Sequence, residues 1–189
     1  AGTQQAFFGV DAYTTTDNAF AGMSEVFNGT LTLNGDSTAY ASVDLDTDAN
    51  AGNVTVNLVA DSDETANDIT ITSLTGSSGD SIVLRSEGGT NGNLTVGEGS
   101  FGGVISETGV GGTLTKNTAG TLTLSGVNTY TGGTNILRGV IEVQNNAALG
   151  TGSVSVQNQS GAGYLTLADG ITLDNNITMT NLGDEKFIT

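Results

Sequence analysis

Closely spaced carboxylates are the residues of this chain best suited to chemistry, and they fall into two groups. The groups are Asp44, Asp46 and Asp48, and then Asp61, Asp63, Glu64 and Asp68. A spacing of two places Asp44, Asp46 and Asp48 on one side of a strand or around one turn, where they repel one another unless a cation lies between them. Carboxylate oxygens of this kind bind calcium, so Asp44, Asp46 and Asp48 form a candidate calcium site.

Three interpretations of these carboxylates remain open. A solvated acidic edge is the reading that the composition favours, because charge also prevents strands from pairing with foreign strands. Calcium binding is the second, although the site is not an EF-hand: Ala49 stands at the position of the sharp-turn glycine and Thr55 at that of the bidentate glutamate. Catalysis is the third, since two carboxyls facing each other across about 5 to 10 Å can cleave polysaccharides.

Composition excludes most other chemistry. The chain has no His and no Cys, so it lacks Ser-His and Cys-His pairs and zinc sites of ordinary composition. We therefore expect no enzyme activity and no cofactor other than calcium. Four basic residues against twenty acidic ones give a net charge of -16, which argues against nucleic acid or anionic lipid as a partner. No apolar run is long enough to span a membrane. Because the chain begins at Ala1, we expect a mature form or an excised piece.

Glycine and threonine dominate the chain, with 29 and 30 copies, and proline is absent. Glycine suits tight turns and threonine suits pleated strands, so the composition predicts many short strands. Nine triplets place a hydroxyl between two apolar residues, the pattern of a strand with one face buried. They are Leu31–Leu33, Val54–Val56, Ile69–Ile71, Leu94–Val96, Leu122–Leu124, Val154–Val156, Leu165–Leu167, Ile171–Leu173 and Ile177–Met179. Phe20, Met23 and Phe27 have helical spacing, which suggests a short N-terminal capping helix as an alternative to an irregular strand.

Similar positions recur at offsets near 20 residues. Leu122 and Ile141 are 19 apart, Ile136 and Val156 are 20 apart, and Val143 and Leu165 are 22 apart. Repeats of this length are typical of stacked coils, so we predict a parallel solenoid with about 20 to 22 residues per coil. A Greek-key sandwich is the alternative that short, closely spaced strands leave open.

The two parts of the chain differ in charge. Residues 1–111 carry fifteen acidic side chains against Arg85 alone, whereas residues 112–189 carry five acidic and three basic side chains. We therefore predict an acidic N-terminal β region at 1–111 and a β-helix at 112–189.

The residues between Gly112 and Val156 carry a family resemblance, most clearly in L-T-L-S-G-x-N-T-Y-T-G-G-T from Leu122 to Thr134. This order of strand, glycine turn and strand resembles the autotransporter-associated β-strand repeat of bacterial surface proteins. The resemblance covers about 45 residues, and it implies a right-handed parallel β-helix and an extracellular scaffold. We read Tyr130, within this motif, as packing on the flank of the rod, with sugar stacking as the alternative. Asn128, Asn145 and Asn146 are expected to serve turns rather than ligands.

Two functions follow as hypotheses. The first is a non-enzymatic structural or adhesive protein of the bacterial cell surface, which self-associates end to end into a fibre or layer because solenoid ends carry unpaired strand edges. Phe7, Phe8, Phe187 and Ile188 are the candidate self-association residues. The second is a β-helix that binds or cleaves polysaccharides, including surface glycans, through clustered carboxylates; few aromatic residues speak against it.

Overall fold

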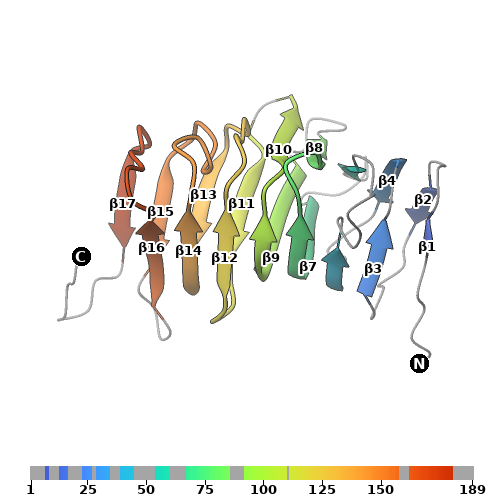
Figure 1. Cartoon of the computed structure of the whole chain (residues 1–189), viewed down its shortest axis with the longest axis horizontal. Helices are drawn as coiled ribbons and strands as arrows, with labels where there is room; N and C mark the ends of the chain where they lie inside the picture. The colour runs from blue at the N-terminus through green and yellow to red at the C-terminus, as the bar shows by residue number, and fades with distance from the viewer. Residues whose placement is uncertain are drawn as a thin grey trace.

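The protein is a parallel β-solenoid in a computed structural model (Figure 1). The structure describes residues 7–8, 13–16, 23–26, 29–34, 39–44, 54–59, 67–85, 92–109, 111–157 and 162–180. Strands within these ranges pair in parallel throughout, and no helix is present among the described residues. The predicted solenoid is confirmed, and the antiparallel sandwich is excluded because it requires the opposite strand direction.

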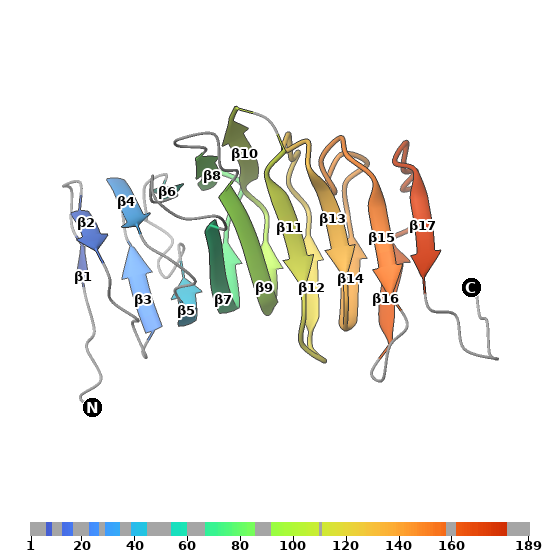
Figure 2. The same cartoon turned by 180° about the vertical axis from the view of Figure 1, so that it is seen from behind.

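One face of the solenoid runs from residue 39 to residue 180, and we call it the first face. Each strand on it is hydrogen-bonded to the strand of the next coil (Figure 2). From the N-terminal end, its strands are β5 (Ala39–Asp44), β7 (Asn67–Gly76), β9 (Gly92–Phe101), β11 (Thr113–Lys116), β13 (Gly133–Ile136), β15 (Val154–Gln157) and β17 (Ile177–Thr180).

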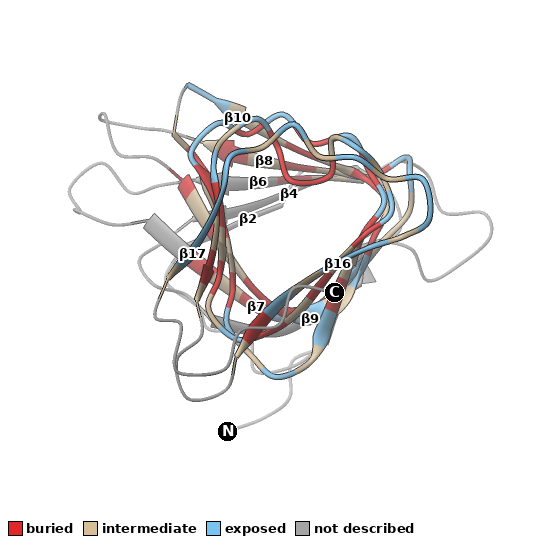
Figure 3. Ribbon diagram, turned by 90° about the vertical axis from the view of Figure 1, so that its left-hand side faces the viewer, coloured by how far each residue is buried: buried red, intermediate tan, exposed pale blue. Residues whose placement is uncertain are grey.

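Two further faces complete the coils, as the view along the solenoid shows (Figure 3). The second face contains β2 (Tyr13–Thr16), β4 (Gly29–Asn34), β6 (Val54–Val59), β8 (Ser81–Arg85) and β10 (Val104–Thr108). The third contains β1 (Phe7–Phe8), β3 (Met23–Val26), β12 (Thr121–Leu124), β14 (Gly139–Val143) and β16 (Gly163–Leu167). The last residues of β5, β7 and β9 join β3 to β12 on this face. The long strand β9 links the first and third faces, because its first half pairs with β11 and Gly99–Phe101 pairs with β12.

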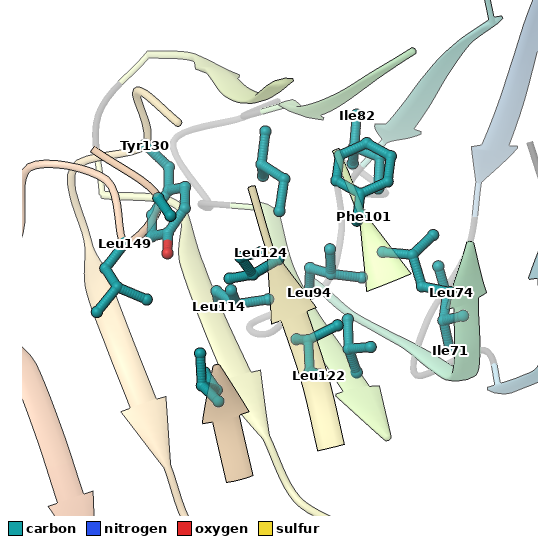
Figure 4. Close-up of a cluster of buried hydrophobic side chains, with 14 of the residues drawn as sticks. Ile71, Leu74, Ile82, Leu94, Phe101, Leu114, Leu122, Leu124, Tyr130 and Leu149 are labelled. Atoms are coloured by element: carbon teal, nitrogen blue, oxygen red, sulfur yellow. The ribbon is translucent and has the colours of Figure 1, made fainter. Parts of the chain in front are cut away.

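Alternation between apolar and polar residues places the core. Leu94 and Val96 of β9 and Leu122 and Leu124 of β12 are fully buried, while the threonines between them face outward and are half-buried. The same alternation in the next coils fills the interior with apolar side chains, of which Leu94, Leu114, Leu122 and Leu124 are seen in Figure 4. Each coil therefore covers the apolar side chains of its neighbour.

The spacing of coils confirms two of the three predicted offsets and corrects the third. Leu122 pairs with Ile141, and Ile136 pairs with Val156, as expected. Val143, however, pairs with Leu167 rather than Leu165. Leu165 and Leu167 both occupy inward positions of β16, because residues two apart in a strand face the same side. Pairing Val143 with either leucine therefore leaves the same side of the strand facing inward. The sequence pattern cannot separate them.

One open alternative is resolved and one local prediction was wrong. Met23–Val26 forms strand β3, which pairs with β1 and β5, so the strand alternative is confirmed and the capping helix is not. The triplet Ile171–Leu173 is not a strand. Its backbone follows a turn closed by a hydrogen bond from Ile171 N to Ala168 O, and Gly170 has a φ of 80°. Ile171 and Leu173 still pack against the core.

Pairing on the first face continues from β9 through β11 to β13 across the expected boundary at residues 111 and 112. Whether residues 1–111 and 112–189 behave as separate units stays a prediction.

Candidate functional site: a three-coil joint in the repeat

The structure does not test the sites that the sequence suggested. Asp44 ends β5, where its backbone pairs with Glu25 on one side and Thr75 on the other. Register thus places two acidic residues, Glu25 and Asp44, side by side in neighbouring coils, a pair that strand spacing alone does not reveal. Asp46 and Asp48 lie outside the described residues. Among the described residues no group of three or more potential acidic, His or Cys ligands is close enough to hold a metal ion. The calcium site therefore stays a prediction.

The candidate self-association residues are also largely outside the described part. Phe7 and Phe8 form strand β1, which pairs with β3, but their side chains are not described. Phe187 and Ile188 lie outside the described residues. The second group of carboxylates lies there too, except for Asp68, whose backbone in β7 pairs with Asn93.

The motif from Leu122 to Thr134 instead forms a joint between three successive coils, built around Asn128. The Asn128 side chain is buried, and its Oδ1 accepts a hydrogen bond of 2.7 Å from Ile105 N in the preceding coil. Its Nδ2 donates to Ala148 O in the following coil. Asn128 N also donates to Ala147 O at 3.0 Å. One side-chain amide thus supplies hydrogen-bond partners to backbone groups of both neighbouring coils. Those groups lie at a corner, where the coils do not pair as β-strands.

Asn145 and Asn146 have the structural roles that the sequence predicted for turn asparagines. Asn145 Oδ1 accepts from Ala147 N, two residues further on, which is an Asx turn. Asn146 Oδ1 accepts from Thr172 N of the following coil.

Tyr130 lies inside the solenoid rather than on its flank. Its side chain is fully buried (Figure 4), so it offers no surface for sugar stacking and both readings made from the sequence are wrong. Thr134 Oγ1 lies 2.6 Å from Tyr130 Oη and donates to Leu149 O at 3.2 Å. Because a hydroxyl has a single proton, Tyr130 must donate to Thr134. Burial raises the pKa of the Tyr130 phenol well above its ordinary value of 10, against a smaller opposing effect of the Thr134 hydrogen bond.

Lys116 is the residue that sequence reasoning missed. It occupies an inward position between Val96 and Ile136 and is fully buried. Its Nζ donates to Thr118 O and, at 3.1 Å, to Arg138 O of the next coil. Burial lowers the pKa of the Lys116 ammonium, and the charge of Glu98 opposes this shift. The alternation of β11 could have identified it, since Lys116 stands where the strand pattern requires an apolar residue.

Glycine occupies the corners at the start of β13 and at the start of β14. Gly139 has a φ of 76°, and a Cβ there would clash with Thr118 O and approach the Lys116 ammonium to 2.7 Å. Gly133 has a φ of 101°, and a Cβ there would lie 2.5 Å from Ser153 O of the next coil. Both positions therefore favour glycine for its conformation and for its lack of a side chain.

Comparison with known proteins finds a repeat family to which this region is similar. The model of the passenger-associated-transport repeat matches residues 114–143, which contain β11 to β14 together with Asn128, Tyr130 and Lys116. Searches of the curated proteins and of the solved structures found no match. Among the described residues, no helix has the length and apolarity needed to cross a membrane.

The repeat supports the resemblance seen in the sequence, and its family implies a secreted or cell-surface protein. The matched coil and the stacked parallel strands around it together fit an autotransporter passenger-type β-helix repeat protein.

Proposed function

We propose that the protein is a non-enzymatic structural scaffold of the bacterial cell surface, and that it self-associates end to end through its C-terminal coil. The passenger-type repeat supports a surface scaffold. A joint whose buried polar groups all bond to backbone or to each other supports a structural role for the repeat rather than a reactive one.

Uncovered core positions at the C-terminal coil carry the proposal. Leu167, Ile177 and Met179 are exposed by 46%, 43% and 41%. Their register partners one coil earlier, Val143, Val154 and Val156, are exposed by 0%, 0% and 5%. The same inward positions are thus buried in one coil and open in the next, because no described coil covers the last one. Exposed apolar surface of this kind favours a covering partner.

Strand edges add to this apolar surface. In the described part of the chain β16 pairs with β14 alone and β17 with β15 alone, so one edge of each lacks a described partner. At the other end β1 pairs with β3 alone. Because the strands are parallel, the N-terminal edge of a second copy has the direction needed to continue the ladder. Such a head-to-tail contact does not close on itself and generates a filament.

Charged substitutions at the uncovered end test this function. We expect the wild-type chain to form concentration-dependent, axially growing oligomers in multi-angle light scattering and short filaments in electron micrographs. The double variant I177K/M179K should remain monomeric, because two charges cannot be buried unpaired beneath another coil. Both side chains are already exposed, so the fold should tolerate the change.

The matched control is Thr178→Lys, which adds one charge to the same strand on its outward side. It should assemble like the wild type. A wild-type chain that is monomeric at every concentration, or a double variant that assembles as well as the wild type, would contradict self-association.

A further inference from the structure

The last described coil carries negative charge next to its uncovered apolar side chains. Residues 163–180 contain β16 and β17, and their charged side chains are those of Asp169 and Asp174. In the sequence Asp169 follows Leu167 by two residues, and Asp174 precedes Ile177 by three. Both aspartates are exposed, and neither carboxylate is bonded to another described residue. No described partner therefore neutralises the charge at this end.

The N-terminal end of the chain has charge of the same sign. Residues 1–34 contain β1 to β4 and carry three acidic side chains and no basic one. Residues 181–189 contribute two acidic side chains and one basic side chain to the other end of the sequence. The basic residues that the structure describes are Arg85, Lys116 and Arg138, and all three belong to coils between the two ends. A head-to-tail contact therefore brings like charges together.

Distance decides how strongly these charges act on one another. When the N-terminal strands of a second copy continue the ladder, its first coil lies about 4.8 Å from the last coil of the first copy. The Debye length is about 30 Å in 0.01 M salt and about 8 Å in 0.15 M salt. Repulsion between the ends is thus almost unscreened in dilute salt and largely screened at higher salt. Burial of apolar surface does not depend on charge and persists at both concentrations.

We propose that ionic strength regulates end-to-end assembly: repulsion between the acidic ends holds chains apart in dilute salt, and screening lets the apolar side chains dock. This inference rests on the proposed self-association through the C-terminal coil and specifies how that contact is controlled. Salt then acts in the direction opposite to that for a contact held by ion pairs, which weakens as salt rises. The control needs no ion-binding site, because mobile counterions supply the screening.

Sedimentation equilibrium of the full chain, at constant pH and increasing NaCl, tests the proposal. We expect the association constant to rise about tenfold between about 0.01 M and about 0.3 M NaCl, because a few unit charges about 10 Å apart are screened over this range. An association constant that stays unchanged or falls as NaCl rises would overturn the inference and leave self-association standing. A chain that is monomeric at every NaCl concentration contradicts self-association, and this inference with it.

Reversal of charge at the uncovered end gives a sharper test. The double variant D169K/D174K places positive charge opposite the acidic N-terminal end, so it should associate more tightly than the wild type in dilute salt and more weakly as NaCl rises. Salting-out of apolar surface would instead strengthen association of both proteins with rising salt, so the direction of the change separates the two causes. Both aspartates are exposed, and circular dichroism should confirm that the variant folds.

The matched control is S100K/T121K, which adds two lysines at exposed positions on β9 and β12 in the middle coils. Its association should rise with NaCl, as for the wild type, because the added charges lie away from the contact. A wild-type direction of salt dependence in D169K/D174K, or a reversed direction in S100K/T121K, would show that charge at the uncovered end does not regulate assembly.

Discussion

At the scale of single residues, buried polar side chains explain why the repeat has its particular motif. Asn128 bonds to the coil before it and the coil after it, Tyr130 donates to Thr134, and Lys116 reaches a carbonyl of the next coil. Backbone groups at the corners between strands have no partners in a β-ladder, so Asn128 and Lys116 supply them at two different corners. The polar residues of the motif hold coils together in the interior, where a ligand cannot reach them.

Replacement of Asn128 should show the strength of this joint. Asn128→Ala leaves Ile105 N and Ala148 O buried without their side-chain partner, and each such group costs about 1 to 3 kcal/mol. We expect the free energy of unfolding, measured by urea denaturation, to fall by about 2 to 4 kcal/mol. Asn146→Ala is the control, because Asn146 is exposed and accepts one hydrogen bond; its effect should stay below about 1 kcal/mol. Equal effects of the two changes would contradict the joint.

Tyr130 should make stability depend on alkaline pH. Its pKa is raised in the folded protein, so above pH 10 the unfolded chain loses the phenol proton while the folded chain keeps it. The contribution of the buried phenol to the free energy of unfolding is therefore fully present below about pH 10 and is lost as the pH rises further. Tyr130→Phe cannot ionise. Urea denaturation at pH 8 to 11 should show that the free energy of unfolding of the wild type falls relative to that of Tyr130→Phe above pH 10. If the two free energies change with pH in parallel, the phenol ionises equally well in the folded protein and the expectation is contradicted.

At the scale of elements, alternation predicted the strands well and register only in part. Eight of the nine triplets lie in strands, because an outward hydroxyl between two inward apolar residues fits one pleat. The triplet at Ile171 shares that pattern yet follows a turn at Gly170, and Met23–Val26 is a strand despite the helical spacing around it. Short segments of this kind adopt the structure that neighbouring coils impose through backbone pairing.

At the scale of the whole molecule, the solenoid is a stack of units whose length is constant only in its central part, since Tyr13 pairs with Leu31, 18 residues further on, and Ala39 pairs with Thr70, 31 residues further on. Leu94, Leu114 and Thr134 are register partners at intervals of 20 residues. Paired residues of successive coils face the same side of the sheet, so coils of equal length are interchangeable in their basic geometry. Stability is then a sum over coils and their contacts rather than the property of one central core.

Deletion of one coil tests this modularity. Removal of residues 114–133 joins Thr113 to Thr134, which places Thr134 and Ile136 opposite Leu94 and Val96 in the register that Leu114 and Lys116 now hold. The shortened chain should keep the circular dichroism of a β-protein and unfold cooperatively, at a lower temperature because the joint at Asn128 is gone. Removal of only residues 114–123 breaks the coil and should prevent folding. Loss of structure in both variants would contradict interchangeable coils.

The sequence by itself indicated the strand pattern, the length of the central coils, a parallel solenoid in preference to a sandwich, and the resemblance of the central repeat to a passenger-type repeat. These follow from local alternation, glycine spacing and motif residues, which are written in adjacent positions. Tertiary structure alone decided that Tyr130 is buried, that Val143 pairs with Leu167, and that Asn128 bonds to the coils on both sides of it. Each of these depends on which residues of distant coils lie side by side. An even shift in register preserves every local pattern while changing those neighbours, and only the stacked coils fix it.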